Sequence, residues 1–188
     1  MIVTLLYIFD FLLLGVIIFL LIKTIVIAIS MITEVPYVPS EKIYKKAIEY
    51  LEINEDDTVL DIGSGDGRVL FYASKKYPEA KFVGVERRIV LVVFSRIKRM
   101  ILNRKNLRFI RENIHNFDIG SFNKIYMYLV PPFINELLTE KEKEIKSSTI
   151  IVSLHYPLGE TFSSINKVIE YPVKYRGKKH FIYKGIKK

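Results

Sequence analysis

The ten residues Val59–Arg68 read VLDIGSGDGR, and this stretch decides the fold. An apolar run carries Asp61 near its end, three alternating glycines follow at Gly63, Gly65 and Gly67, and a helical pattern begins directly afterwards. Alternating glycines let a backbone turn tightly and let a ligand approach it closely. The helix that follows points its first N–H groups at that ligand. The segment therefore predicts a strand, a ligand-binding turn and a helix. A strand-to-helix turn without a ligand is the simpler alternative, but it requires fewer glycines.

Strands and helices alternate on the C-terminal side of this motif, which is typical of a parallel sheet with helices on both faces. The pattern ends in a hairpin around Arg176-Gly177, and a helix precedes the first strand. The predicted strands are Thr58–Ile62, Lys81–Glu86, Leu107–Arg111, Lys124–Leu129, Thr149–His155, Lys167–Tyr175 and His180–Ile186. The predicted helices are Glu41–Glu52, Arg68–Lys76, Arg88–Asn103 and Pro132–Lys146.

A second acidic residue ends the second predicted strand. Glu86 lies 19 residues beyond Gly67 and closes the run KFVGVE. A carboxylate in this place can accept hydrogen bonds from both hydroxyls of a ribose. A dinucleotide-dependent dehydrogenase would share this feature. Against it, an acid precedes the first glycine, and the chain leaves little room for a second, substrate-binding domain.

Together these residues resemble the Rossmann-like (class I) methyltransferases that use S-adenosylmethionine, and the resemblance runs from about Val35 to the C-terminus. It implies an α/β fold with a doubly wound, mostly parallel seven-stranded sheet and an antiparallel C-terminal strand. It also implies that Glu86 binds the cofactor ribose and that Asn113, where many relatives have Asp, lies near the adenine. The methionine part of the cofactor would be held by Asp61, Gly63, Ser64, Gly65 and Gly67.

The order of several short motifs narrows the resemblance. An apolar N-terminal helix is followed by PYVPS (Pro36–Ser40), DIGSGDGR and YLVPPF (Tyr128–Phe133). This order is similar to that of the membrane-anchored protein-lysine methyltransferases related to the enzyme that modifies the c subunit of ATP synthase. The resemblance implies a protein substrate with an accessible lysine, such as a membrane protein. It places Ser40 at the site and Tyr37 where it would shape the lysine channel, as the candidate catalytic residue. Arg87-Arg88 departs from the family pattern.

Other functions stay open at this point. A membrane anchor also suits a small-molecule or lipid methyltransferase. A non-catalytic module tethered to the membrane is another class, against which the intact Asp61 and Glu86 count.

Val130-Pro131-Pro132-Phe133 is similar to the NPPY motif of enzymes that methylate nucleobase amines. Val130 stands where that motif has Asn, and its side chain cannot accept a hydrogen bond. The prolines otherwise serve to end a strand and begin a helix.

The first 32 residues contain Asp10 and Lys23 as their charged side chains, and Phe11–Ile22 is apolar throughout. About 20 apolar residues span a bilayer, so we expect a transmembrane anchor at 1–32, a linker at 33–40 and the methyltransferase domain at 41–188. A cleaved signal peptide is the alternative, although its basic N-terminal region is missing. Because lysines lie within or after the apolar stretch, we expect a single-pass protein with its catalytic domain in the cytoplasm.

The net charge of +9 is concentrated in one segment. Arg87–Arg111 holds nine basic residues and no acidic one. On the helix expected there, Leu91, Val92 and Leu102 fall on the same arc as several cations, a mixture that suits an anionic membrane surface. A solvated basic face is an equal alternative, and binding of nucleic acid is a weaker one.

The remaining composition limits the chemistry. The absence of cysteine excludes thiol catalysis and disulfides, and three scattered histidines make a histidine metal cluster unexpected, so we predict no metal site. His155 ends a strand at the edge where ligands bind, yet a lone histidine there is more often structural. A sulfonium cation and desolvation both favour a neutral lysine amine, so no dedicated base is obligatory.

Overall fold

The computed structural model describes residues 2–32, 42–158, 165, 168–175 and 177–188. The chain divides into two compact units, Met1–Val38 and Pro39–Lys188. The first holds one helix, α1 (Ile2–Ile32). Within it Tyr7–Ile25 has a mean hydropathy of 2.5 and is long and apolar enough to cross a membrane. A signal sequence meets the same criterion, so the anchor, the linker and the predicted boundaries of the domain stay predictions.

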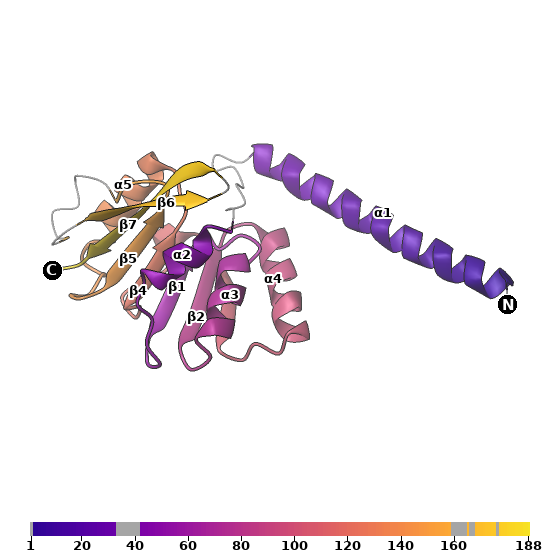
Figure 1. Ribbon diagram of the computed structural model, residues 1–188, viewed down its shortest axis with the longest axis horizontal. Coiled ribbons are helices and arrows are strands. Elements are labelled where there is room, and N and C mark those ends of the chain that lie inside the picture. Colours follow the sequence, from indigo (N-terminus) through magenta and orange to yellow (C-terminus); the bar gives the residue numbers. More distant parts are fainter. Residues whose placement is uncertain (1, 33–41, 159–164, 166–167, 176) are drawn as a thin grey trace. The chain divides into compact units, whose positions relative to one another are not determined.

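The second unit is built on a seven-stranded sheet in the order β3-β2-β1-β4-β5-β7-β6 (Figure 1). The first five strands in the chain run parallel, whereas β7 runs antiparallel to both of its neighbours, β5 and β6. The predicted fold class is therefore confirmed. The strands are β1 (Thr58–Ile62), β2 (Lys81–Glu86), β3 (Leu107–Arg111), β4 (Lys124–Met127), β5 (Ile150–Leu154), β6 (Ile169–Tyr175) and β7 (Lys178–Ile186).

Helices cover both faces of this sheet, as the strand–helix alternation predicted. Alternation along each strand sends residues such as Val59 and Phe82 into one apolar core, which α2 and α3 cover. Leu60, Ile62 and their neighbours form a second core with α5 on the opposite face. The helices are α2 (Tyr44–Glu49), α3 (Arg68–Lys76), α4 (Ile89–Ile101), α5 (Pro131–Glu140) and the short 3-10 helix η1 (Ile114–Asn116).

Several helices are shorter than their sequence pattern predicted, and local backbone geometry gives the reason. Asn103, just beyond α4, adopts φ +47°, and Glu52, beyond α2, adopts φ +52°. A left-handed residue cannot continue a right-handed helix, so each segment stops before it. After α5 the chain makes further turns, in which Lys141 Nζ pairs with Glu144 Oε1 at 2.8 Å, rather than continuing the helix to Lys146.

The parallel direction of β1 to β5 gathers the loops that carry chemistry at one edge. Asp61 and the glycines, Glu86 and Asn113 lie at or just after the carboxyl ends of β1, β2 and β3. Tyr128 follows β4 and His155 follows β5 in the same way. The carboxyl edge of a parallel sheet is where ligands bind in open α/β folds.

Candidate active site at the carboxyl edge of the sheet

The glycine-rich turn after β1 is fixed by backbone hydrogen bonds to the neighbouring strand. The N–H groups of Gly63 and Ser64 both donate to the carbonyl oxygen of Val85, at 2.9 and 3.0 Å. The predicted glycines adopt φ values of +74° (Gly63), +56° (Gly65) and +72° (Gly67), in the left-handed region that favours glycine. The turn that the sequence predicted is therefore present, immediately before α3.

Gly67 has a packing reason for lacking a side chain. A Cβ atom there would lie 2.5 Å from Cζ of Phe109 on β3, closer than packed atoms approach. Gly84 on β2, which the sequence did not single out, lies beneath the same turn, where a Cβ would stand 2.7 Å from Ser64 Oγ. The cofactor role of Gly67 stays a prediction, and its contact with Phe109 requires glycine independently of any ligand.

Glu86 holds the turn from the end of β2. Its carboxylate is buried and accepts a hydrogen bond from the Gly65 N–H at 3.1 Å. Its second oxygen accepts bonds from the Arg88 backbone N–H and from Arg88 Nε, at 2.9 and 3.0 Å. A carboxylate has about four acceptor positions, so one position remains for a ligand hydroxyl. Glu86, the residue predicted to bind the ribose, thus also links Gly65 to the start of α4.

Asp61 is the most buried acid of the site. Its side chain is 2% exposed, and Oδ2 has no hydrogen-bond partner among the described residues. Burial, followed by the negative charges of Glu86 and Asp66, raises the pKa of Asp61 well above its usual range. A buried carboxyl without a partner is costly unless a cationic or donor group meets it. The amino group of a bound methionine moiety is such a group.

Tyr126 lies beside Asp61 and was missed by the sequence analysis. The two residues are paired in register across β1 and β4. The Tyr126 hydroxyl is buried without a hydrogen-bond partner among the described residues. Burial and the Asp61 charge raise the pKa of Tyr126 well above its usual range. In the sequence Tyr126 looks like any core position of an apolar strand, and only the register of the sheet brings it to the site.

Two further polar residues have clear local roles. Asp66 accepts the Arg68 backbone N–H at 3.1 Å and pairs with the Arg68 guanidinium at 2.6 Å, so it caps the start of α3. Asn113 begins η1, where its side chain accepts the His115 N–H at 3.4 Å. Asn113 lies just beyond β3, as predicted, and its contact with an adenine stays a prediction.

Aromatic rings form the other side of the edge, beyond β4 and β5. The Tyr128 ring lies 5.4 Å from the His155 ring and stacks on Tyr156 at 6.2 Å between centroids. His155 lies 4.8 Å from His180 at the start of β7, and Tyr175 on β6 meets His180 edge-on. Sequence reasoning placed His155 at this edge but missed its partner, because 25 residues separate the two histidines.

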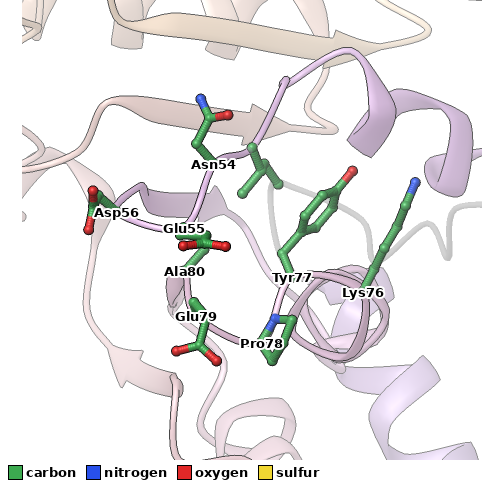
Figure 2. A pocket seen from close by; sticks show the side chains of 9 residues that line it. Asn54, Glu55, Asp56, Lys76, Tyr77, Pro78, Glu79 and Ala80 are labelled. Carbon is green, nitrogen blue, oxygen red and sulfur yellow. The ribbon is translucent and has the colours of Figure 1, made fainter.

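The opposite edge of the sheet carries a separate pocket. It has a volume of about 610 Å³ and is lined by residues 53–56 and 76–80, at the amino ends of β1 and β2. Figure 2 shows the side chains of Glu55, Asp56, Glu79 and Lys76 around it. The glycine turn and the aromatic rings lie at the other ends of the strands. The candidate site is therefore the carboxyl edge. The predicted residues Tyr37 and Ser40 lie outside the described residues, so their place at the site stays a prediction.

The fold and this edge define a class I methyltransferase. The solved structure of an RNA methyltransferase from Salinibacter ruber in complex with S-adenosyl-L-homocysteine has the same fold, with a TM-score of 0.69 at 23% identity over 80% of this chain and 95% of that one. The glycine turn, the unpartnered Asp61 oxygen and Glu86 fit S-adenosylmethionine, which is the cofactor of this class. The family model of the ANTKMT methyltransferase domain matches residues 61–163, and the chain belongs to that family.

Curated relatives support the same family. The chain is 34% identical to a protein-lysine N-methyltransferase of Saccharolobus islandicus over 134 residues, which cover 69% of this chain and 81% of that protein. It is 29% identical to a lysine N-methyltransferase of Caenorhabditis elegans that is named for the c subunit of ATP synthase, over 57% of this chain and 55% of that protein. The matched region of the second relative is therefore just over half of its length.

Proposed function

We propose that this protein transfers methyl groups from S-adenosylmethionine to lysine side chains of proteins. The observation that carries the proposal is the buried carboxyl of Asp61, whose Oδ2 lacks a hydrogen-bond partner among the described residues, beside Glu86 at the end of a class I methyltransferase sheet. Membership of the ANTKMT family supports it, as do relatives that are named as protein-lysine methyltransferases.

Different residues of the carboxyl edge would bind different parts of the cofactor. When bound, S-adenosylmethionine supplies a methyl group on a sulfonium centre. Asp61 would meet its amino group, Glu86 its ribose and Asn113 its adenine, while the Gly63–Gly67 turn admits close approach to the backbone. Val130 precedes the two prolines at the start of α5 and offers no side-chain acceptor. This argues against a nucleobase amine as the acceptor.

The acceptor lysine must arrive neutral and aligned. A lysine has a pKa of about 10.4 in water, so its proton must be lost before the nitrogen can attack. A nearby positive charge and removal of water both favour the neutral form. Tyr37 is proposed to shape the channel that guides this side chain.

We further propose that the enzyme works at an anionic membrane, with α1 as its anchor. The surface of α4 supports this in a form that differs from the sequence prediction. Leu91 and Val92 are buried rather than mixed with the cations. The exposed apolar side chains of this segment are instead Ile89, Val93, Phe94, Ile97, Met100, Ile101 and Leu102, each 46–78% exposed.

Cations alternate in sequence with these exposed apolar residues, since Arg96 precedes Ile97 and Arg99 precedes Met100. Arg96 Nε donates to the Phe109 carbonyl oxygen at 3.0 Å, and Arg99 Nε donates to the Arg104 carbonyl oxygen at 3.2 Å. Apolar side chains flanked by arginine and lysine suit the boundary between headgroups and acyl chains. The surface therefore fits an anionic bilayer better than it fits bulk water.

Transfer of label tests the acceptor. Tritiated S-adenosylmethionine and the full chain are added to membranes from cells that lack the protein, and protein, lipid and RNA fractions are counted separately. We expect the label in protein, on lysine by mass spectrometry. Label in lipid or RNA with none on lysine would show that the acceptor is not a protein lysine.

Extraction at alkaline pH tests the membrane anchor. The full chain should stay with the membranes, whereas release into carbonate would contradict a membrane span.

A further inference from the structure

We propose that His155 accepts the proton that the substrate ammonium must lose, and that His180 positions its ring for this task. The proposal rests on the proposed function, because it assigns the acceptor half of the same site. Tyr128 and Tyr156 complete this subsite as the walls beside His155. Together the four residues are called the imidazole subsite below.

The two histidines form a direct contact. His180 Nδ1 and His155 Nε2 are 3.4 Å apart, within hydrogen-bond distance. His155 is partly exposed at the end of β5, whereas His180 is 6% exposed within the sheet. One ring thus faces the edge where substrates arrive and the other supports it from inside. The remaining nitrogen of His180, Nε2, is buried without a hydrogen-bond partner among the described residues.

The backbone of His155 is held in an unusual conformation. Its φ is +70°, in the left-handed region that few residues other than glycine adopt. Its N–H donates to the Phe181 carbonyl oxygen on β7 at 2.9 Å, which ties this conformation to the strand that carries His180. Strained backbone of this kind gathers at functional sites, because a structure retains it where it positions a needed group.

The imidazole subsite lies beside the cofactor side of the edge. Tyr128 follows β4 directly, and β4 is the strand whose Tyr126 is paired with Asp61. The aromatic faces of Tyr128 and Tyr156 offer an ammonium group and its alkyl stem a favourable surface.

A group that takes up a proton near neutral pH would speed the loss of the lysine proton, although no dedicated base is obligatory. Imidazole is the side chain that does so without a large perturbation. An N–H bond of the substrate ammonium breaks and an N–H bond forms on Nδ1 of His155, which leaves a neutral amine and an imidazolium. Nε2–H of that imidazolium donates to Nδ1 of His180. The proton then returns to water from the exposed side of His155.

Among the described residues, three phenols pack against the two histidines. They belong to Tyr128 after β4, Tyr156 after β5 and Tyr175 on β6. Beside His180 on β7, the Lys179 ammonium lies 4.9 Å above the Phe181 ring.

The first test measures amine binding without turnover. The full chain, in detergent micelles and labelled with ¹³C,¹⁵N-histidine, is saturated with S-adenosylhomocysteine and titrated with n-butylamine, which carries the lysine terminus. The ring signals of His155 and His180 should shift, while those of His115, which pairs with Glu140, should not. Unchanged signals from both histidines at saturating amine would overturn the proposal, whatever the natural acceptor is.

The second test separates proton transfer from folding. Asn tolerates a positive φ, so His155→Asn keeps the backbone and removes the imidazole. Transfer of label to membrane protein should fall about 100-fold at pH 7, and the deficit should shrink toward pH 10, where solvent deprotonates the lysine itself. His180→Gln should lower the rate less and shift the midpoint of the pH profile, and His115→Gln should change neither.

The outcomes distinguish this proposal from the proposed function. If lysine is labelled and His155→Asn retains the wild-type rate and pH profile, the histidine assignment is wrong and the proposed function stands. A deficit that is equal at every pH would make the role of His155 structural. If lysine is never labelled but n-butylamine shifts the histidine signals, the imidazole subsite stands and the acceptor is another amine.

Discussion

The two sides of the carboxyl edge are built from different chemical groups. Around β1 to β3, the site consists of a backbone turn with left-handed glycines and two buried carboxyls, Asp61 and Glu86. Around β4, β5 and β7 it consists of rings, with Tyr128 and His155 in contact at 5.4 Å. The first side presents N–H groups and acceptors at fixed places, which suits a constant ligand. The second presents polarisable surfaces, which suit a long apolar side chain with a cationic end.

This difference also separates what could and could not be predicted. The residues of the glycine side are adjacent in sequence, since Asp61 and Gly67 lie within seven residues, so a local pattern reveals them. Tyr126, His155 and His180 come together through the register of three strands, and one sequence does not give that register. For the same reason the parallel sheet with helices on both faces was predicted, because strand–helix alternation is a local signal. The seven strands and the antiparallel C-terminal strand followed from the resemblance to class I methyltransferases. On α4, Leu91 and Val92 were wrongly predicted to be exposed, whereas Leu102, just beyond the helix, is exposed as predicted. The helical arc alone did not show which side packs on the sheet.

The largest expected effect tests whether Gly67 is required for packing against Phe109 independently of ligand binding. Gly67→Ala places a Cβ 2.5 Å from the Phe109 ring and forces a side chain into φ +72°. We expect a loss of about 3 kcal/mol in the free energy of unfolding, as overpacking and left-handed strain combine. Urea denaturation of the full chain in detergent micelles, without cofactor, measures it.

A matched glycine provides the control. Gly177 has φ +75°, but a Cβ added there would meet nothing within 4 Å, so Gly177→Ala should cost about 1 kcal/mol from strain alone. Phe109→Leu in the Gly67→Ala background should recover part of the larger loss. Equal losses for the two glycine variants would show that packing against Phe109 contributes nothing.

The next effect concerns the ribose position on the glycine side. Glu86→Gln keeps the shape of the side chain but weakens the acceptors that meet Gly65 N–H and Arg88. We expect affinity for S-adenosylmethionine to fall about 10- to 100-fold, because a charge-assisted hydrogen bond is replaced by a neutral one. Isothermal calorimetry measures the affinity, with Glu170→Gln on β6 as the matched control. Similar affinities for the wild type and the Glu86 variant would remove Glu86 from the cofactor site.

Asp61 should link cofactor binding to pH through its raised pKa. The unfolded chain ionises Asp61 near 3.8, whereas burial keeps the folded carboxyl protonated to higher pH. Stability therefore falls as pH rises above 3.8 and until the folded pKa is reached. Asp61→Asn removes this loss, so at pH 7.5 the variant should melt a few degrees higher than the wild type without cofactor.

When the cofactor is bound, Asp61→Asn should be unfavourable rather than stabilising. A cationic amino group beside the carboxyl favours its ionised form, so Asp61→Asn should bind S-adenosylmethionine about tenfold more weakly. Thermal melts between pH 4 and 8, with and without the cofactor, measure both effects. The melting temperatures of the two chains should converge near pH 4. A variant that is less stable at pH 7.5 without cofactor would contradict a raised pKa of Asp61 in the folded chain.

The smallest expected effect lies at Asn113, where the two roles of one side chain can be separated. Its oxygen accepts the His115 N–H at 3.4 Å and caps a three-residue helix, and the predicted second role is an adenine contact. Asn113→Asp keeps the cap and removes the amide donor, whereas Asn113→Ala removes both. If the adenine is held through the side-chain oxygen alone, Asn113→Asp should bind S-adenosylmethionine as the wild type does. Asn113→Ala should then bind it about fivefold more weakly, since one partly exposed hydrogen bond is worth about 1 kcal/mol. Weakening by both substitutions to the same extent would assign the amide donor to the adenine. Full affinity in both variants would limit Asn113 to its capping role, and the glycine side of the edge would then end at Glu86.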